Sequence, residues 1–473
     1  MNAPFRLLAL ALIVGSLSAC ALGPDYQRPE LDIPQQFRQA EGWKPAQPAD
    51  ALERGAWWAL YDDWELNALV ERLNVSNQNL AAAEARFRQA RALARGARAA
   101  FYPTVSGSVE AGRASGGGSQ SGVGTGRRES FDASLGLNWQ LDLWGRLRRT
   151  LESERAGAQA SAADLAAVRL SLQAELVQNY LQLRVLDEQR RLLDATLEAY
   201  QRSLRLTENQ YRAGIVPKSD VTQALTQLKS TQAQAVDLEW QRAQLEHAIA
   251  VLIGLPPTEF AIQARNNLPR LPAIPPAVPS QLLERRPDVA SAERSVMAAN
   301  AAIGVAKTAW FPDLSLSAVG GYRSGSFSDW ISLPNRYWSL GPALAMQLFD
   351  GGARRAELER TEAAYDQTVA EYRQTVLEAF REVEDALVEL SVLEREQALQ
   401  QEAVEAARES LRLVENQYRA GTVDFNSVVN VQAAALNNQR SALTLLGNRL
   451  RASVQLIAAL GGGWDTTQLG RLE

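Results

Sequence analysis

The 473-residue sequence contains very few residues of the kinds that catalytic and metal centres use, with one cysteine, Cys20, and one histidine, His247. This inventory excludes zinc sites built from several Cys and His ligands, a thiol with a resolving partner, and a triad with more than one imidazole. His247 falls in a helical pattern, where an ordinary histidine is a simpler interpretation than a ligand. We therefore expect no catalytic residue, no metal ligand, no cofactor and no enzymatic activity.

The sequence also lacks a strong charge imbalance and long apolar runs. The net charge is −5 and acidic and basic residues are interspersed, which gives no argument for nucleic acid as a partner. Beyond the N-terminus no stretch approaches 18 uninterrupted apolar residues, so the sequence predicts no transmembrane helix. The glycine-rich residues 115–126 lack the Gly-Lys-Ser/Thr ending of a phosphate loop, and we interpret them as a hairpin loop.

One stretch occurs twice. The run Asn-Gln-Tyr-Arg-Ala-Gly ends at Gly214 and again at Gly421, 207 residues later. Each copy closes a long run with apolar residues at helical spacing, and a second helical run follows each glycine. Arginine near a helix end complements the helix dipole, and glycine adopts the left-handed conformation that ends helices. The sequence therefore predicts two equivalent helical hairpins with their tips at these glycines.

The N-terminus has the pattern of a lipoprotein signal peptide. In residues 1–19 a short basic region precedes an almost wholly apolar run that is too short to span a bilayer. The following Leu-Ser-Ala-Cys resembles a bacterial lipobox, which implies cleavage before Cys20 and acylation of Cys20. The alternative is an ordinary secretory signal with an incidental cysteine. Residues 20–65 are rich in proline and tryptophan, and we expect an extended strap that Trp57 and Trp58 dock onto the main body.

The remaining chain divides into two similar repeats, residues 66–254 and 288–461, with a proline-rich connector at 255–287 and a tail at 462–473. In the first repeat we expect a helix at 67–100, strands at 103–112 and 131–141, a helix of about 100 Å at 146–211 and a returning helix at 219–253. The second repeat predicts a helix at 288–309, a strand starting at 314, a strand at 338–348, and helices at 353–418 and 427–460.

The strands are amphipathic, which is typical of membrane barrels. In residues 131–141 apolar side chains alternate with Asp, Ser, Gly, Asn and Gln. Four strands cannot close a barrel, and open strand edges are not tolerated in hydrocarbon. The fold class we predict is therefore mainly α with a membrane β-barrel, which a dimer, trimer or tetramer would close with 8, 12 or 16 strands. Aromatic residues fall where membrane belts are expected, at Phe101, Tyr102, Phe131, Trp144, Trp310, Phe311, Tyr337, Trp338 and Phe349.

Several motifs resemble those of the TolC-type outer-membrane factors, and more closely their NodT-like lipoprotein branch. They are Pro-Asp-Tyr at 24–26, the two Asn-Gln-Tyr-Arg-Ala-Gly tips, Leu-Leu-Glu-Arg-Arg-Pro-Asp at 282–288, and Ala-Asn-Ala at 299–301 before Phe311-Pro312. The resemblance covers nearly the whole chain. It implies a homotrimer with a 12-stranded β-barrel continuous with an α-barrel of coiled-coil hairpins, lipid-anchored in the bacterial outer membrane with its helical body in the periplasm. It further implies the exit duct of a tripartite efflux system, which docks a periplasmic adaptor (membrane fusion protein) and an inner-membrane pump, most simply of the RND type.

The resemblance also assigns roles to the hairpin tips, which in that family close the periplasmic entrance. Asp220 matches the family's tip aspartate and Tyr418 its tip tyrosine, so a hydrogen bond between them would hold the closed state. Asp220 could instead cap the returning helix, together with Ser219. The remaining positions depart from the family pattern: Val423 replaces a gating arginine, and Ser427 and Asn430 replace the carboxylates of the narrowest ring. The gate would then depend on apolar packing of Val423, Phe425 and Val428.

Two rival functions remain open on the sequence alone. A lipid-anchored coiled-coil scaffold would explain the heptads and Cys20 but not the amphipathic strands. The outer-membrane component of type I protein secretion would have the same fold and a different cargo. The cargo itself leaves no signature, and with Met297 and Met346 as the only methionines after the first residue, the sequence does not support a methionine relay for metal ions.

Overall fold

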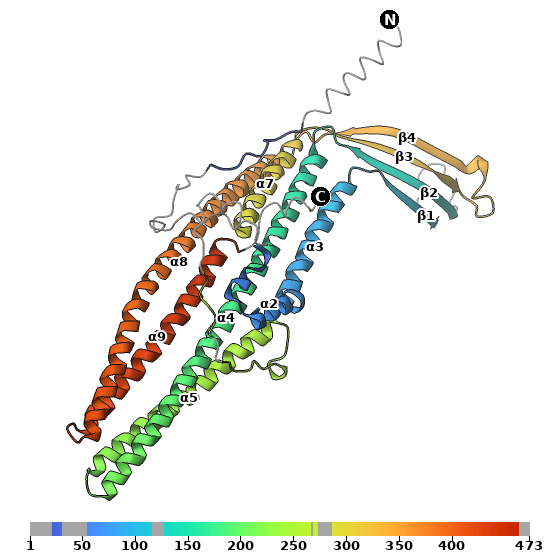
Figure 1. Ribbon diagram of the computed structural model, residues 1–473. Coiled ribbons are helices and arrows are strands. Elements are labelled where there is room, and N and C mark those ends of the chain that lie inside the picture. The colour runs from blue at the N-terminus through green and yellow to red at the C-terminus, as the bar shows by residue number, and fades with distance from the viewer. Residues whose placement is uncertain (1–20, 31–53, 116–126, 266–267, 273–285, 463–473) are drawn as a thin grey trace. The chain divides into compact units, whose positions relative to one another are not determined.

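The computed structural model describes residues 21–30, 54–115, 127–265, 268–272 and 286–462, which form two compact units. The first, the sheet unit, combines the start of the chain to residue 30 with residues 86–161 and 291–373. The second, the hairpin unit, combines residues 31–85, 162–290 and 374–473. Each unit thus contains equivalent parts of both repeats (Figure 1).

The sheet unit contains one four-stranded antiparallel sheet in the order β1-β2-β3-β4. Its strands are β1 (Thr104–Ser115), β2 (Arg127–Leu141), β3 (Asp313–Ser324) and β4 (Arg336–Ala345). All four predicted strands are confirmed, although β4 ends before Met346 and Leu348, which were expected to extend it. A short 3₁₀ helix, η4 (Leu333–Asn335), precedes β4. The outer sides of β1 and β4 have no partner strand among the described residues.

Four helices form the two hairpins, and each hairpin pairs a helix of 67 residues with one of 35 residues. They are α4 (Arg146–Arg212, 67 residues), α5 (Lys218–Leu252, 35 residues), α8 (Ala353–Arg419, 67 residues) and α9 (Phe425–Ala459, 35 residues). Gly214 and Gly421 have φ of +73° and +74°, as the repeated stop signal predicts. At each tip the amide after the glycine returns to a carbonyl five residues earlier, which satisfies backbone groups that the helix end leaves free.

A helix predicted as continuous from 67 to 100 is two helices, α2 (Trp64–Ser76) and α3 (Gln78–Ala99). Asn77 causes the break, because its backbone is extended, its N–H donates to the Leu73 carbonyl oxygen at the end of α2, and its side chain caps the start of α3. Its Oδ1 accepts a hydrogen bond from the Leu80 amide at 2.9 Å, and its Nδ2 donates to the Leu252 carbonyl oxygen at 2.7 Å. The spacing of leucines continues across the joint, so apolar periodicity alone did not reveal it.

The core of the hairpin unit lies where α4, α5 and α9 meet α2 and the short 3₁₀ helix η2 (Arg54–Tyr61). Trp57 and Trp58 are buried there, which confirms their docking role, and the Tyr61 hydroxyl lies 2.7 Å from Ser453 Oγ. The expectation of a wholly extended strap to residue 65 was wrong, because residues 54–61 are helical and α2 begins at Trp64.

Helix α7 (Pro287–Thr308) precedes β3, and part of the connector forms a 3₁₀ turn, η3 (Pro257–Glu259). Within the described residues, none of the helices is both long enough and apolar enough to cross a bilayer. The signal peptide, Cys20, most of the glycine-rich loop and much of the proline-rich connector lie outside the described residues.

Candidate functional site

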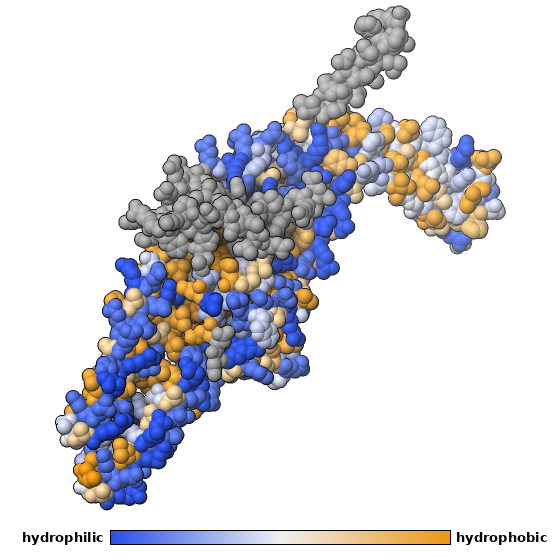
Figure 2. All heavy atoms as spheres, in the orientation of Figure 1, coloured by the Kyte–Doolittle hydropathy of each residue, from blue (hydrophilic) through white to orange (hydrophobic). Residues whose placement is uncertain are grey.

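The sheet has one apolar and one polar face. Apolar and polar residues alternate along the strands, and directly paired residues of adjacent strands lie on the same face. Val105 pairs with Leu137, Leu137 with Ala318, and Ala318 with Leu340, so one row of four strands is wholly apolar. Much of this face stays uncovered by the part of the chain that the structure describes: Val105 is 69% exposed, Leu135 66% and Leu340 65%. Figure 2 shows apolar strand residues at the surface among polar ones. Such an exposed face fits contact with lipid.

The opposite face carries charged and hydroxyl side chains that bond to each other. Arg323 Nε donates to Asp132 Oδ2 at 2.7 Å, and the Tyr337 hydroxyl donates to the same carboxylate at 3.1 Å. Ser108 and Ser134 join their hydroxyls at 2.9 Å. A polar face opposite a lipid-compatible one is the arrangement that a water-filled lumen requires.

Aromatic residues of the predicted belts gather where the strands join the helices. The Trp144 and Phe311 rings lie 4.9 Å apart, and Trp144 Nε1 donates to the Pro312 carbonyl oxygen at 2.7 Å. Trp139 Nε1 donates to the Phe101 carbonyl oxygen at 2.9 Å. The Arg354 guanidinium lies 6.0 Å from the centre of the Trp310 ring. Tyr102 and Phe349 are exposed, at 63% and 87%.

A second aromatic group lies at the other end of the strands, and the sequence identified only part of it. Phe131 contacts Phe327 and Trp330, with ring centres 5.5 and 5.7 Å away. The belt residue Trp338 is 75% exposed. Phe327 and Trp330 lie in the β3–β4 loop, outside the strand patterns from which the belts were predicted. Their proximity to Phe131 extends the predicted belt.

The strap residues next to Cys20 are fastened to the sheet unit by one buried arginine. Arg149 is 6% exposed and donates to the Leu22 carbonyl oxygen at 3.1 Å and to Asp25 Oδ1 at 2.8 Å. Asn300 Nδ2 donates to the Pro24 carbonyl oxygen at 3.0 Å. The motif at 24–26 therefore contacts the motif at 299–301 directly. The Leu22 amide donates to the Trp144 carbonyl oxygen at 3.2 Å, which ties the strap to the junction of β2 and α4.

At the first tip, the predicted capping role of Asp220 and Ser219 was wrong. Helix α5 begins at Lys218, its N-cap residue is Pro217, and no side chain caps it. Asp220 lies within the first turn, where its carboxylate accepts a hydrogen bond from Ser219 Oγ at 3.2 Å. A carboxylate there still interacts favourably with the helix dipole.

At the second tip, Asp424 caps α9 by accepting hydrogen bonds from the amide and the hydroxyl of Ser427, at 2.9 and 2.6 Å. The hydrogen bond from Ser427 Oγ is the main reason why the pKa of Asp424 lies below its usual range. Ser427, predicted from the family resemblance to line the entrance, thus belongs to a helix cap. Asn430 lies one turn further along α9 and is exposed.

Tyr418 joins the two tips, but through a different partner from the one predicted. Its hydroxyl donates to Gln210 Oε1 at 2.8 Å and not to Asp220. Burial raises the pKa of Tyr418, and the charge of Asp220 adds to this effect, so the aspartate acts on the hydroxyl electrostatically. The Tyr418 ring lies 5.6 Å from that of Phe425.

Apolar packing at the tips centres on Phe425 and Val428, which are 2% and 3% exposed. Both pack against Ala224 of the first hairpin, with Leu204, Val414, Tyr418 and Val429 around them. Val423, the third residue of the predicted apolar gate, is half-buried and lies outside this cluster. The two hairpin tips therefore share a small core of their own.

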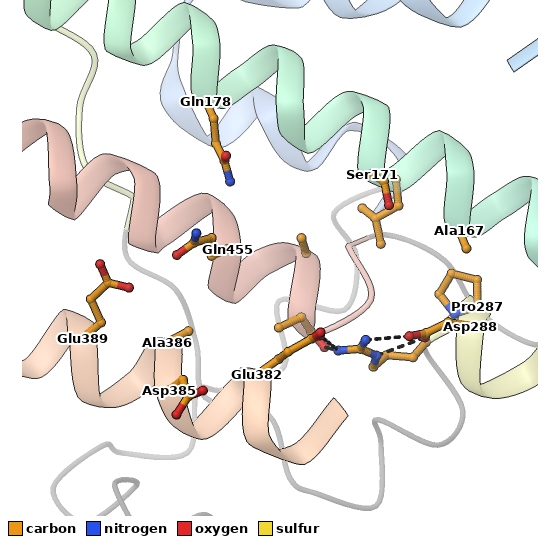
Figure 3. Close-up of a pocket in the computed structure, with 14 residues that line it drawn as sticks. Ala167, Ser171, Gln178, Pro287, Asp288, Glu382, Asp385, Ala386, Glu389 and Gln455 are labelled. Carbon is orange, nitrogen blue, oxygen red and sulfur yellow. Dashed lines mark hydrogen bonds and ion pairs between the residues drawn. The ribbon is translucent and has the colours of Figure 1, made fainter. Parts of the chain in front are cut away.

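A pocket of about 510 Å³ lies in the hairpin unit (Figure 3). Its lining includes Asp288, Glu382, Asp385 and Glu389, and one buried cation, Arg286. Arg286 donates to Glu382 at 2.7 Å, to Asp288 at 2.6 Å and to the carbonyl oxygen of Ala459 at 3.1 Å. Burial opposes its charge, but the hydrogen bonds and charges of Asp288 and Glu382 outweigh burial and raise the pKa of Arg286.

This pocket has a structural explanation. Arg286 joins the end of the connector to α8 and to the end of α9, and its bonds explain the presence of Arg286 and Asp288, which periodicity left unexplained. Among the described residues, no three His, Cys, Asp or Glu side chains gather in a way that could hold a metal ion.

Comparison with known proteins agrees with this geometry. A family model described as outer membrane efflux protein matches residues 69–255 and 278–462. The pyoverdine export outer membrane protein OpmQ of Pseudomonas aeruginosa is 33% identical over 472 residues, which is 98% of each chain. The cation efflux system protein CusC of Escherichia coli is 30% identical, covering 98% of this chain and 99% of CusC.

Solved structures show the same fold. The outer-membrane channel OprN superposes with a TM-score of 0.87 and 33% identity, covering 94% of this chain and all of OprN (100%). A crystal structure of CusC gives a TM-score of 0.83 and 27% identity, covering 94% of this chain and 100% of CusC. The family model spans most of both repeats, and the relatives match over nearly their whole length. The chain therefore belongs to the outer membrane efflux protein family.

Proposed function

We propose that three copies of this chain form a passive channel through the outer membrane, whose hairpin tips dock a periplasmic adaptor and an inner-membrane efflux pump. Membership of the family places the chain in the outer membrane as a component of efflux. The trimer, the docking partners and the lipid anchor at Cys20 are the additional elements of the proposal.

The observation that carries the proposal is the amphipathic sheet with two unpaired edges. Its apolar face is exposed at Val105 of β1, Leu135 of β2 and Leu340 of β4, and β1 and β4 each lack an outer neighbour among the described residues. Backbone groups at such edges cannot remain unsatisfied in hydrocarbon, so the edge of one copy must pair with that of another. Three copies would give a closed barrel of twelve strands.

A passive channel also fits the variety of cargo named for the relatives. OpmQ is named for pyoverdine export, CusC for cation efflux and TtgC for toluene efflux. Their sequences are about equally similar to this one, so the outer-membrane component carries little selectivity for cargo. We expect the partner pump to select the cargo of this protein.

The mass of the detergent-solubilised protein tests the assembly. We expect a complex of three chains of 51.8 kDa each, less the signal peptide, with sheet signal in circular dichroism. A water-soluble monomer without sheet signal would refute the channel.

Replacing Cys20 separates the channel from the lipid-anchored scaffold. A scaffold should leave the membrane fraction in a Cys20→Ser variant exported through an ordinary signal peptide. A channel should remain in the membrane and require detergent. Type I secretion makes a different prediction, namely a co-purifying pump that exports polypeptides, and identification of the co-purifying transporter distinguishes it.

A further inference from the structure

Helix α3 is strongly positive in a chain that is acidic overall. It contains five arginines and a single acid, Glu84, whereas the whole chain has a net charge of −5. Four of the arginines recur at helical spacing, which places them on one side of α3, and all four are exposed. We call them the arginine stripe: Arg88, Arg91, Arg95 and Arg98.

The arginine stripe lacks a counter-charge. In the part of the chain that the structure describes, none of its guanidinium groups forms a hydrogen bond or an ion pair with an acid, and the Arg91 guanidinium only contacts the Phe87 ring, 5.7 Å from its centre. Like charges three and four residues apart on a helix repel each other and destabilise it. A negatively charged partner on this side of α3 would offset that repulsion.

The second repeat contains an equivalent of α3, which shows how the stripe is oriented. Helices α3 and α7 both have 22 residues, and the strands that follow them, β1 and β3, both have 12. Since α3 begins at Gln78 and α7 at Pro287, equivalent residues in this part of the repeats differ by 209. Val105 and Leu314, which are equivalent, both lie on the apolar face of the sheet. Equivalent positions thus face the same way.

On α7 the strap covers the positions equivalent to the stripe. Asn300, the equivalent of Arg91, is 4% exposed and donates to a backbone carbonyl oxygen of the strap at 3.0 Å. Gly304, the equivalent of Arg95, lies so close to the strap that a Cβ added to Gly23 would be 2.5 Å from its Cα. Glycine lets the strap pass over α7, whereas the same point of α3 carries an exposed arginine.

The strap also indicates which side of the channel wall the stripe occupies. The strap follows Cys20, and Ala21 lies at the junction of β2 and α4, where a Cβ added to Gly145 would be 2.8 Å from the Ala21 Cα. Acyl chains on Cys20, as proposed above, would enter the bilayer that surrounds the barrel, so the strap lies on the outer side of the wall. The stripe, at equivalent positions, then lies on the outer side and not in the passage.

The last two arginines of the stripe lie at the level of the membrane surface. Arg98 precedes the first residue of β1 by six, and the belt residue Tyr102 between them is 63% exposed. At 1.5 Å per residue, Arg95 lies about 5 Å and Arg88 about 15 Å further from the sheet than Arg98. The headgroup layer is roughly 5–7 Å thick on each side of the hydrocarbon, so Arg98 and Arg95 reach it and Arg88 does not.

The helix dipole explains only part of this pattern. A cation in the last turn of a helix interacts favourably with the dipole, and the effect falls off within that turn. It would explain Arg98, and Lys307 at the equivalent position of α7. It does not explain Arg95 and Arg91, which lie a full turn or more before the end of α3.

We propose that Arg95 and Arg98 bind the phosphate groups of anionic phospholipids in the inner leaflet of the outer membrane, the leaflet that faces the periplasm. Guanidinium groups match phosphate oxygens in geometry and donate paired hydrogen bonds to them. The negative headgroups also supply the counter-charge that the stripe lacks within the described chain. This lipid-binding surface goes beyond the proposed channel and rests on it in one respect, namely that the sheet enters the bilayer.

Native mass spectrometry of the full-length protein tests the surface. The protein in a neutral detergent is mixed with equal amounts of dioleoylphosphatidylglycerol and dioleoylphosphatidylcholine, and the lipids that it retains are counted. We expect the wild-type protein to retain more of the anionic lipid, and less so at high salt. Arg95→Gln with Arg98→Gln should lower this preference by roughly fivefold for each arginine removed. Arg95→Lys with Arg98→Lys keeps the charge and should retain most of the preference.

Arg86→Gln with Arg88→Gln is the matched control, because it removes two exposed arginines from the same helix at a greater distance from the bilayer. It should leave the lipid preference unchanged. An unchanged preference in the Arg95→Gln and Arg98→Gln variant, or an equal loss in the control, would overturn the proposal. Loss of the trimer mass with the lipid preference intact would show that the stripe contacts a neighbouring copy instead. A wild-type trimer that retains both lipids equally would refute the lipid surface alone, and a wild-type monomer would refute the proposed assembly as well.

Discussion

Two buried arginines bind the segments that precede the two repeats, the strap before the first and the connector before the second. Arg149, on α4, bonds to the backbone of residues 22 and 23 and to Asp25, so the lipobox is followed directly by a docked segment. Arg286 bonds to Asp288, Glu382 and the end of α9. Both arginines are polar residues with a fixed structural role, which explains motifs that neither helical nor strand periodicity accounts for.

Replacing Arg149 should release the strap. In Arg149→Met the carbonyl oxygens of Leu22 and Gly23 lose their donors, which should cost about 1–3 kcal/mol of local stability. We expect faster cleavage by chymotrypsin after Tyr26, with Arg155→Met, an exposed arginine on the same helix, as the control. Equal cleavage rates in the two variants would contradict the proposed role of Arg149.

The tip residues should differ in their effect on leakage through the closed channel. Phe425→Ala removes a buried ring from the core shared by both hairpins, which costs about 3–5 kcal/mol in typical cores. Tyr418→Phe loses one hydrogen bond, to Gln210, worth about 1 kcal/mol. We expect leak conductance in planar bilayers to rise strongly in the first variant and slightly in the second.

Asp220→Ala should leave leak conductance near the wild-type value, because Tyr418 bonds to Gln210 instead. A larger increase with Asp220→Ala than with Phe425→Ala would show that the aspartate, and not apolar packing, holds the tips. An unchanged conductance in all three variants would remove the gating role of the tips.

At the level of single elements, the sequence predicted nearly all helices and strands, because each has a clear period and a clear stop signal. Gly214 and Gly421 end their helices as expected. The α2–α3 break was missed because Asn77 interrupts the backbone without disturbing the leucine spacing. The side-chain contacts at the tips were predicted less well, since the partner of Tyr418 depends on how two hairpins pack.

The cap of α9 should depend on pH in one direction. The pKa of Asp424 is lowered by its hydrogen bonds with Ser427, so the cap stabilises the helix above the usual carboxyl pKa, near 4. This stabilisation is lost as the pH falls through the lowered pKa. We expect Asp424→Ala to speed hydrogen exchange in the first turn of α9 at neutral pH but not at strongly acidic pH. A difference that persists at low pH would argue against capping.

For the whole molecule, the sheet sets the main requirement. Among the described residues, four strands leave one unpaired edge on each side of the sheet. Such edges need a partner strand in a membrane, so stability and function both depend on assembly. The amphipathic strands made this requirement visible in the sequence, whereas the contacts at the tips needed the structure because they depend on how the two hairpins pack.

The conductance of the purified protein in planar lipid bilayers tests the channel most directly. We expect discrete conductance steps from the trimer, small for the wild-type protein and larger for Phe425→Ala. Folded, membrane-inserted protein that gives no conductance steps in either form would contradict the central claim that copies of this chain enclose a passage through the membrane.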